Sequence, residues 1–287
     1  MGVRVATGAV FAVVILICIF LGGWALRAMI LFAALTGMFE MYRALEHKGM
    51  KPVKWVGYLF MVMCSGFEIL KAVFDAPLFQ SADPILCALL ISALLAACVV
   101  ILRGKVDFDA LVSSMFPLIY PGVFFGLMMC VQDMSDRYTV SAALVLMFFA
   151  ASINDVFALL VGVRFGKHRL SPEISPKKSI EGSIGGIIAC VIFAVLVPTC
   201  FTALWHLFPS INPRGYILPH LWEFALFGLV TGALSQIGDL TASLVKRHCG
   251  IKDYGKIFAG HGGMMDRMDG ILFCSAVCWF FFHLIGA

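Results

Sequence analysis

The sequence predicts an all-α, polytopic integral membrane protein with about nine transmembrane helices. Hydrophobic residues make up 61% of the 287 residues and charged residues only 13%, whereas a soluble domain carries about 25% charged residues. Long, unbroken apolar stretches recur along the chain, each near the roughly 20 residues that a helical span needs. The alternating pattern of a membrane barrel is absent from the sequence, so helices are the structure that satisfies the backbone in lipid.

Nine apolar segments cover most of the chain. They run near residues 5–22, 24–45, 54–74, 85–102, 111–131, 138–163, 183–205, 221–245 and 270–286. The first resembles a signal peptide, because Arg4 precedes it, but no small-x-small cleavage site follows and the next segment begins directly after Gly23. We expect it to be a membrane helix. We divide the chain into N-terminal membrane helices, 1–137, and C-terminal helices, 138–287, which carry the candidate catalytic loops.

The basic residues predict the orientation in the membrane. With the N-terminus in the cytoplasm, 17 of the 21 Lys and Arg residues fall on the cytoplasmic side, as the positive-inside rule requires. The two polar loops 164–182 and 246–269 then lie on this same side. We expect an inner or plasma membrane protein whose N-terminus and loops are cytoplasmic and whose C-terminus is outside.

Two carboxylates fall inside predicted membrane helices, where ionisable groups are costly and are candidates for function. Asp239 lies seven residues before Lys246, and Asp155 lies nine residues before Arg164. At 1.5 Å per residue they lie roughly 10 Å and 13 Å below the cytoplasmic helix ends. Similar depths on one side predict a single polar cavity cut into the membrane. The alternative is that both are structural carboxylates bonded to neighbouring helices.

The helix around Asp239 carries a polar stripe. Gln236, Asp239, Ser243 and Lys246 are spaced at i, i+3, i+7 and i+10, which places them on one helix face, and Arg247 follows. A stripe with an anion and cations suits a metal-bound polyphosphate, because a carboxylate holds Mg²⁺ and cations meet phosphate oxygens.

The following loop adds glycines and two further carboxylates. His261 precedes Gly262 and Gly263, and Asp266 and Asp269 follow at the start of the last helix. Adjacent glycines let a backbone approach a ligand and present N–H groups to phosphate. The two Asp residues are three apart, so both can face one way.

These motifs resemble a known family. The run from Ser243 to Asp269 closely resembles the signature of the phosphatidate cytidylyltransferase family, and Gln236-x-Gly238-Asp239-Leu240 resembles it too. So does Lys167 with the stretch 174–182, where Ser179 stands in place of the usual Thr. The strong resemblance covers about 155–186 and 236–270, and the first half of the chain matches only in hydropathy.

The resemblance implies a nucleotidyltransferase of phospholipid biosynthesis that converts CTP and phosphatidic acid into CDP-diacylglycerol and pyrophosphate. It implies Mg²⁺ as cofactor, as one or two divalent ions, with a monovalent ion as a further option. Membrane lipid is an expected partner and nucleic acid is not. Family members look like homodimers, although no residue pattern in this chain shows it.

The residues fit this chemistry on physical grounds, since the phosphate of phosphatidate is already ionised near neutral pH and attack needs mainly alignment and charge neutralisation. The predicted catalytic residues are Asp239, Asp266, Lys246, Ser243 and Asp155. The predicted metal ligands are Asp239, Asp266 and Asp269. The predicted substrate-binding residues are Lys177, Lys178, Arg247, Arg267, His261, Gly262, Gly263, Lys167, Ser175 and Gln236. His261 either bonds phosphate or orients the loop, and the Lys177–Lys178 pair has positive-inside topology as its alternative explanation.

Other function classes remain open at this point. The CDP-alcohol phosphotransferase pattern lacks its Arg after Asp269-Gly270, and no P-loop is present. A CTP-dependent lipid kinase is an alternative, because loop chemistry alone does not decide which phosphorus of CTP is attacked. An ion-coupled transporter, with carboxylates that relay protons or Na⁺, is another. The polar groups crowd near one face in the C-terminal half, which favours an enzyme.

Overall fold

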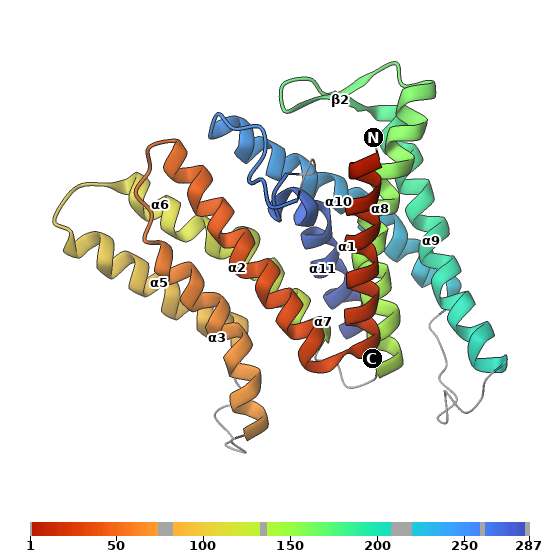
Figure 1. The fold of residues 1–287 in the computed structure, drawn as a ribbon, viewed down its shortest axis with the longest axis horizontal. Coiled ribbons are helices and arrows are strands. Elements are labelled where there is room, and N and C mark those ends of the chain that lie inside the picture. The colour runs from red at the N-terminus through yellow and green to blue at the C-terminus, as the bar shows by residue number, and fades with distance from the viewer. Residues whose placement is uncertain (1, 74–82, 133–136, 208–219, 259–261, 285–287) are drawn as a thin grey trace. The chain divides into compact units, whose positions relative to one another are not determined.

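The protein is almost entirely helical in a computed structural model, which describes residues 2–73, 83–132, 137–207, 220–258 and 262–284 (Figure 1). The helices are α1 (Gly2–Leu21), α2 (Gly23–His47), α3 (Lys54–Val73), α5 (Pro84–Leu102), α6 (Phe108–Pro117), α7 (Phe124–Gln132), α8 (Arg137–Phe165), α9 (Ile180–Leu207), α10 (Leu221–His248) and α11 (Met265–Leu284). A π-helical segment, η1 (Leu118–Val123), joins α6 to α7, and strands β1 (Arg169–Ser171) and β2 (Ser175–Ser179) pair antiparallel. The predicted all-α class is confirmed.

Each of the nine predicted segments coincides with a helical region. Within the described residues, six helical stretches are long and apolar enough to cross a membrane: those of α2, α5, α6 to α7, α8, α9 and α10. The chain is therefore an integral membrane protein, while the count of nine spans is not confirmed. α11 falls short because Asp266, Arg267 and Asp269 occupy its first two turns.

The first two segments are separate helices because the backbone turns sharply between them. Gly22 and Gly23 have φ of 61° and 48°, a left-handed conformation that glycine adopts without the steric cost of a Cβ. The predicted break after residue 22 is therefore correct.

The fifth predicted segment, 111–131, is broken where a single helix was expected. Pro117 and Pro121 lie in its middle, and Tyr120 leaves helical geometry with φ of −127° and ψ of 109°. Proline lacks the N–H of the helical ladder and its ring clashes with the preceding turn. The apolar pattern was correct, and the prolines decide that the segment is α6, η1 and α7.

The chain forms two compact units, and both are discontinuous in sequence. Unit 1 comprises residues 1–132 and 245–268, and unit 2 comprises 133–244 and 269–287. Residues 245–268, which make up most of the signature run, belong to unit 1. The core of unit 1 contains the fully buried side chains of Met38, Tyr42 and Phe60.

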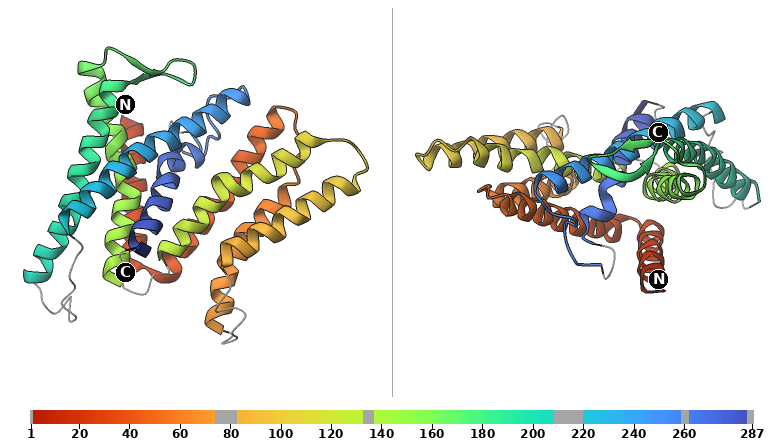
Figure 2. Two further views of the ribbon diagram at one scale, coloured as in Figure 1. Left: turned by 180° about the vertical axis from the view of Figure 1, so that it is seen from behind. Right: turned by 90° about the horizontal axis from the view of Figure 1, so that it is seen from above.

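In unit 2, α8 and α9 run along each other, and the β1–β2 hairpin joins their ends (Figures 1 and 2). Glycines allow close packing of α10 on α9: a Cβ at Gly228 would lie 2.7 Å from the Cα of Val191, and one at Gly232 would lie 3.1 Å from that of Ile187. Buried Phe224 of α10 packs against the aromatic rings of α11. These contacts fix the helices from which the polar residues of unit 2 project.

Candidate active site

The β1–β2 hairpin is tied to the start of α9. Ser179 precedes the helix, and its Oγ accepts the N–H of Gly182 at 3.2 Å, as a helix N-cap does. Glu181 accepts the backbone N–H groups of Lys167 and His168 and meets His168 Nδ1 at 2.7 Å. The hydroxyl of Ser179, the residue that stands in place of the usual Thr, thus has a structural role. The hairpin that carries Lys177 and Lys178 is anchored at its base.

A cavity of about 470 Å³ lies in unit 2 against this hairpin, a volume typical of small-molecule sites. Its charged lining residues are Asp155 of α8, Arg169 of β1, Lys177 and Lys178 of β2, and Asp239 of α10. Two carboxylates and three cations share one space. This balance suits a polyanionic ligand that arrives with a cation. The predicted common cavity of Asp155 and Asp239 is present.

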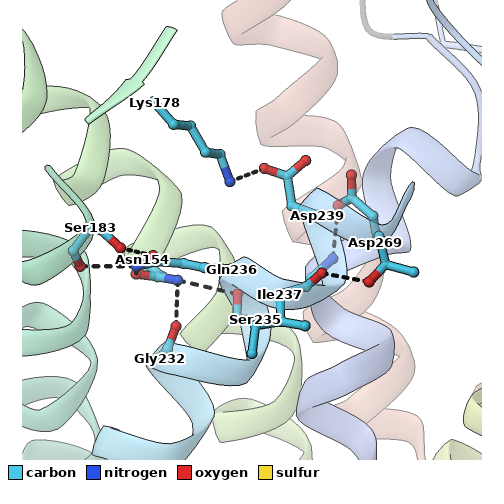
Figure 3. Close-up of polar contacts among 11 residues, drawn as sticks. Asn154, Lys178, Ser183, Gly232, Ser235, Gln236, Ile237, Asp239 and Asp269 are labelled. Atoms are coloured by element: carbon cyan, nitrogen blue, oxygen red, sulfur yellow. Dashed lines mark hydrogen bonds and ion pairs between the residues drawn. The ribbon is translucent and has the colours of Figure 1, made fainter. Parts of the chain in front are cut away.

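Lys178 and Asp239 form an ion pair across this cavity (Figure 3). Their side chains are 24% and 22% exposed, so the pair is neither in bulk water nor fully sealed. Lys178 reaches Asp239 from the hairpin, and Asp239 projects from α10. Because Lys178 lies on β2 and Asp239 on α10, a bound phosphate could draw Lys178 away from the carboxylate without disturbing the hairpin or the helix.

An amide network joins the three helices beside the cavity (Figure 3). Asn154 is fully buried, and its Nδ2 donates to Gly232 O at 3.0 Å and to Ser235 Oγ at 3.3 Å. Gln236 Nε2 donates to Asn154 Oδ1 at 3.0 Å and to Ser183 O at 2.9 Å, and the Ser183 hydroxyl donates to Gln236 Oε1. Satisfied buried networks of this kind fix helix positions. Gln236 lines the cavity and also holds α8, α9 and α10 together.

Asp269 lies close to the backbone of α10. A Cβ on Gly238 would come to 2.5 Å from the Asp269 carbonyl oxygen and 2.8 Å from the Phe273 ring. The absent side chain at Gly238 therefore lets α10 and α11 approach at the residue next to Asp239. Asp269 Oδ1 accepts the N–H of Gly270 at 2.8 Å.

Asp266 is the centre of a polar cluster in unit 1. Its Oδ1 meets Lys246 Nζ at 2.7 Å, and its Oδ2 accepts the N–H groups of Tyr254 at 2.8 Å and Gly263 at 2.9 Å. The side chains of Lys246 and Asp266 are only 12% and 6% exposed. Lys246 also lies over the ring of Tyr254, 5.5 Å from its centroid. The glycine loop and the lysine that were predicted to bind phosphate thus converge on one carboxylate.

Almost the whole chain is similar to proteins of one family. A family model described as "Cytidylyltransferase family" matches residues 2–285. The chain belongs to this cytidylyltransferase family. Phosphatidate cytidylyltransferase of Bacillus subtilis is 31% identical to it over 286 residues, which cover 98% of this chain and 97% of the relative.

Two further relatives match most or about half of the chain. Phosphatidate cytidylyltransferase 5, chloroplastic, of Arabidopsis thaliana is 28% identical over 294 residues, covering 92% of this chain and 67% of the relative. Phosphatidate cytidylyltransferase of Mycobacterium tuberculosis is 40% identical over 139 residues, covering 48% of this chain and 38% of the relative. The resemblance read from the motifs is confirmed.

The remaining predicted site residues differ in their exposure. Ser243 is largely buried on α10, while Arg247 at the end of that helix and Arg267 on α11 are exposed. Lys167 is exposed beside the hairpin, and Ser175 pairs with Ser171 at its turn. His261 lies outside the described residues.

Three polar residues that the sequence did not single out are brought to the cavity or the amide network by the fold. Arg169 joins the cavity because β1 pairs with β2, with Arg169 opposite Ser179. Asn154 and Ser183 form the amide network with Gln236. Asn154 precedes Asp155 in an apolar helix, so its polarity was a usable signal. Arg169 carried no such signal, because a basic residue in a cytoplasmic loop is explained by topology alone.

Proposed function

We propose that the chain is a phosphatidate cytidylyltransferase that acts within the membrane. A phosphate oxygen of phosphatidic acid attacks the α-phosphorus of CTP and forms a new P–O bond. The bond from the α-phosphorus to the bridging α–β oxygen breaks, and pyrophosphate leaves with its electron pair. The products are CDP-diacylglycerol and pyrophosphate. The observation that carries the proposal is the cavity of two carboxylates and three cations in a chain whose full-length relatives bear this name.

The nucleophile needs no protein base. The second pKa of a phosphate monoester is about 6, by analogy with phosphorylated side chains, so the attacking oxygen is already anionic near neutral pH. The work left to the protein is to align the two phosphates and to neutralise their charge. A cavity lined by fixed cations meets this need better than a general base would.

Three cations of unit 2 would hold the phosphates. Arg169, Lys177 and Lys178 line the cavity from the hairpin, and guanidinium and ammonium groups make strong charge-assisted bonds to phosphate oxygens. Lys178 would exchange Asp239 for phosphate as substrate enters. Gln236 would keep the cavity wall in place through its bonds to Asn154 and Ser183.

The carboxylates fit a divalent cation. Mg²⁺ is bound through one or two carboxylates together with substrate phosphates, and rarely by an all-protein cage. This agrees with the absence, among the described residues, of any cluster of three or more His, Cys, Asp or Glu side chains arranged for a metal. Asp239 would hold the ion, and Asp269 remains a proposed second carboxylate ligand of unit 2, while Asp155 lines the same cavity as Asp239. When bound, the ion would supply charge neutralisation to the transferring phosphoryl group.

Residues of unit 1 would contribute separately. Lys246, Arg247 and Arg267, with the N–H groups of Gly262 and Gly263, remain proposed phosphate contacts. Asp266 remains a proposed metal ligand, and its bonds to Lys246 and two backbone N–H groups also give it the task of shaping the loop.

The reaction predicts where radiolabel goes. With CTP labelled at the α-phosphorus, phosphatidic acid and Mg²⁺, the purified protein should transfer label to lipid, because the α-phosphoryl group stays in the product. With label at the γ-phosphorus, all of it should leave as pyrophosphate. Thin-layer chromatography of the lipid and of the aqueous phase measures both. Label from the γ-position in lipid would instead identify a CTP-dependent lipid kinase, and no release of pyrophosphate from folded protein would refute the proposal.

We further propose nine spans, with the N-terminus and the loops 164–182 and 246–269 in the cytoplasm and the C-terminus outside. The bias of 17 of 21 basic residues supports this orientation. Single cysteines are engineered in each loop of a cysteine-depleted chain. In intact cells they should react with a membrane-impermeant maleimide only after the membrane is permeabilised. A loop that reacts from the outside would contradict the orientation. The inner or plasma membrane location and the homodimer also remain proposals.

A further inference from the structure

Glu40 is a buried carboxylate in the first half of the chain, outside the two motif regions 155–186 and 236–270. It lies on α2 and is 1% exposed. Its Oε2 accepts the N–H of Met265, the first residue of α11, at 2.8 Å across 225 residues of sequence. Burying a carboxylate is costly unless it is well bonded. The chain buries Glu40 at the start of α11, the helix that carries Asp266.

The signature loop is shaped around this carboxylate. A Cβ on Gly255 or on Gly263 would collide with the carboxylate oxygens of Glu40. Both glycines are buried, and they lie on opposite sides of the loop in sequence. Neither has a positive φ, so the space that Glu40 occupies, rather than backbone conformation, accounts for glycine at these two positions.

A second contact from the same helix reaches the same loop. Arg43, one turn after Glu40, donates to the carbonyl oxygen of Tyr254 at 3.3 Å. The N–H of Tyr254 in turn donates to Asp266, and so does the N–H of Gly263. Two of the residues that bond Asp266 are therefore in contact with α2: Arg43 donates to Tyr254, and Glu40 lies against Gly263. Glu40 also accepts the N–H of Met265, next to Asp266.

The contact with Met265 also caps the N-terminus of α11. The first N–H groups of a helix have no partner within it, and a nearby negative charge is favourable at this end. Glu40 supplies an acceptor and a charge from another helix, so it caps α11 in place of a local side chain. Any shift of α2 would move the start of α11, and with it the carboxylate of Asp266.

We propose that Glu40 is a positioning residue for the cytidylyltransferase reaction. It fixes the described parts of the signature loop, 254–258 and 262–265, and thereby the orientation of the Asp266 carboxylate and its partner Lys246. This inference rests on the proposed function of the chain, and it assigns Glu40 no contact with substrate.

Three variants test the proposal. Glu40→Ala removes the acceptor, Glu40→Gln keeps an amide oxygen for Met265 N–H, and Glu46→Ala is the matched control. Glu46 lies further along the same helix, is exposed, and meets Lys54 at 2.9 Å. Glu40→Ala should lower kcat about 100-fold, as a misplacement of about 1 Å does. Glu40→Gln should stay within about tenfold of wild type, the factor of one net hydrogen bond. Glu46→Ala should match wild type.

Hydrogen exchange gives a readout that does not depend on turnover. In protein without substrate, the amides of Tyr254, Gly263 and Met265 should exchange faster in Glu40→Ala than in wild type, and those of α8 and α9 should not change. Glu46→Ala should show the wild-type pattern throughout. A residue that only stabilised the fold would instead raise exchange across unit 1 and leave the kcat of the folded fraction unchanged.

The outcomes separate this inference from the proposed function. If wild type and Glu46→Ala make no CDP-diacylglycerol, the function is wrong, and the exchange data alone judge the role of Glu40 in the loop. If they are active and folded Glu40→Ala keeps wild-type kcat, or its loop amides stay protected, the positioning role is refuted. If Glu40→Gln is as inactive as Glu40→Ala, the acceptor at Met265 is not what positions the loop, and the inference fails.

Discussion

Replacement of Asp239 by Asn is expected to lower kcat/KM by several orders of magnitude. Asn keeps the size of the side chain and removes the charge that would hold a divalent cation in the unit 2 cavity. Metal neutralisation supplies several kcal/mol to a transition state of this kind, and each 1.36 kcal/mol is about a factor of ten in rate. Pyrophosphate release by purified protein over a range of Mg²⁺ concentrations measures the loss. Asp109→Asn, at an exposed carboxylate on α6, is the control.

Two further variants separate metal binding from ion pairing, because Asp239 also meets Lys178. Lys178→Met removes the cation, and the double variant removes both charges. If Asp239 served only to pair Lys178, the double variant would be no worse than Lys178→Met alone. We expect it to be as inactive as Asp239→Asn. Activity of Asp239→Asn within tenfold of wild type would remove the assignment. Asp155→Asn, in the same cavity, should also be severely impaired.

Asp266→Asn is expected to lose activity by a similar factor and, unlike Asp239→Asn, to lose stability. Asp266 and Lys246 are both largely buried, and removing one partner of a buried ion pair leaves an uncompensated charge at a cost of about 3–5 kcal/mol. The side chains of Asp239 and its partner Lys178 are more exposed, at 22% and 24%. Thermal unfolding in detergent should therefore show a clearly lowered midpoint for Asp266→Asn and a small change for Asp239→Asn.

The double variant Asp266→Asn/Lys246→Met tests the cause of this instability. It removes both charges, so the unfolding midpoint should recover most of the loss, while activity should stay low. If the midpoint did not recover, the bonds from Tyr254 and Gly263 to the carboxylate, and not the charge of Lys246, would account for the stability. Wild-type activity in the double variant would contradict a role for either residue in the reaction.

Much of the fold and part of the site were readable from the sequence, because they depend on local pattern. Apolar run length predicts membrane helices, since lipid leaves the backbone no other partner than itself. Turn chemistry at Gly22 and Gly23 separates the first two helices. Asp155 and Asp239 were visible because a charge in an apolar helix stands out against its neighbours, and their similar predicted depths agree with the one cavity that both line.

What only the tertiary structure decided are the partners that come from distant parts of the chain. Strand pairing turns Arg169 into a cavity residue, and helix packing joins Asn154 to Gln236. Glu40 meets Met265 across 225 residues, and no local sequence pattern predicts such a contact. Hydropathy and helical spacing record which face of a helix is polar, whereas the choice of partner depends on how helices pack in three dimensions, which the sequence of each helix alone does not contain.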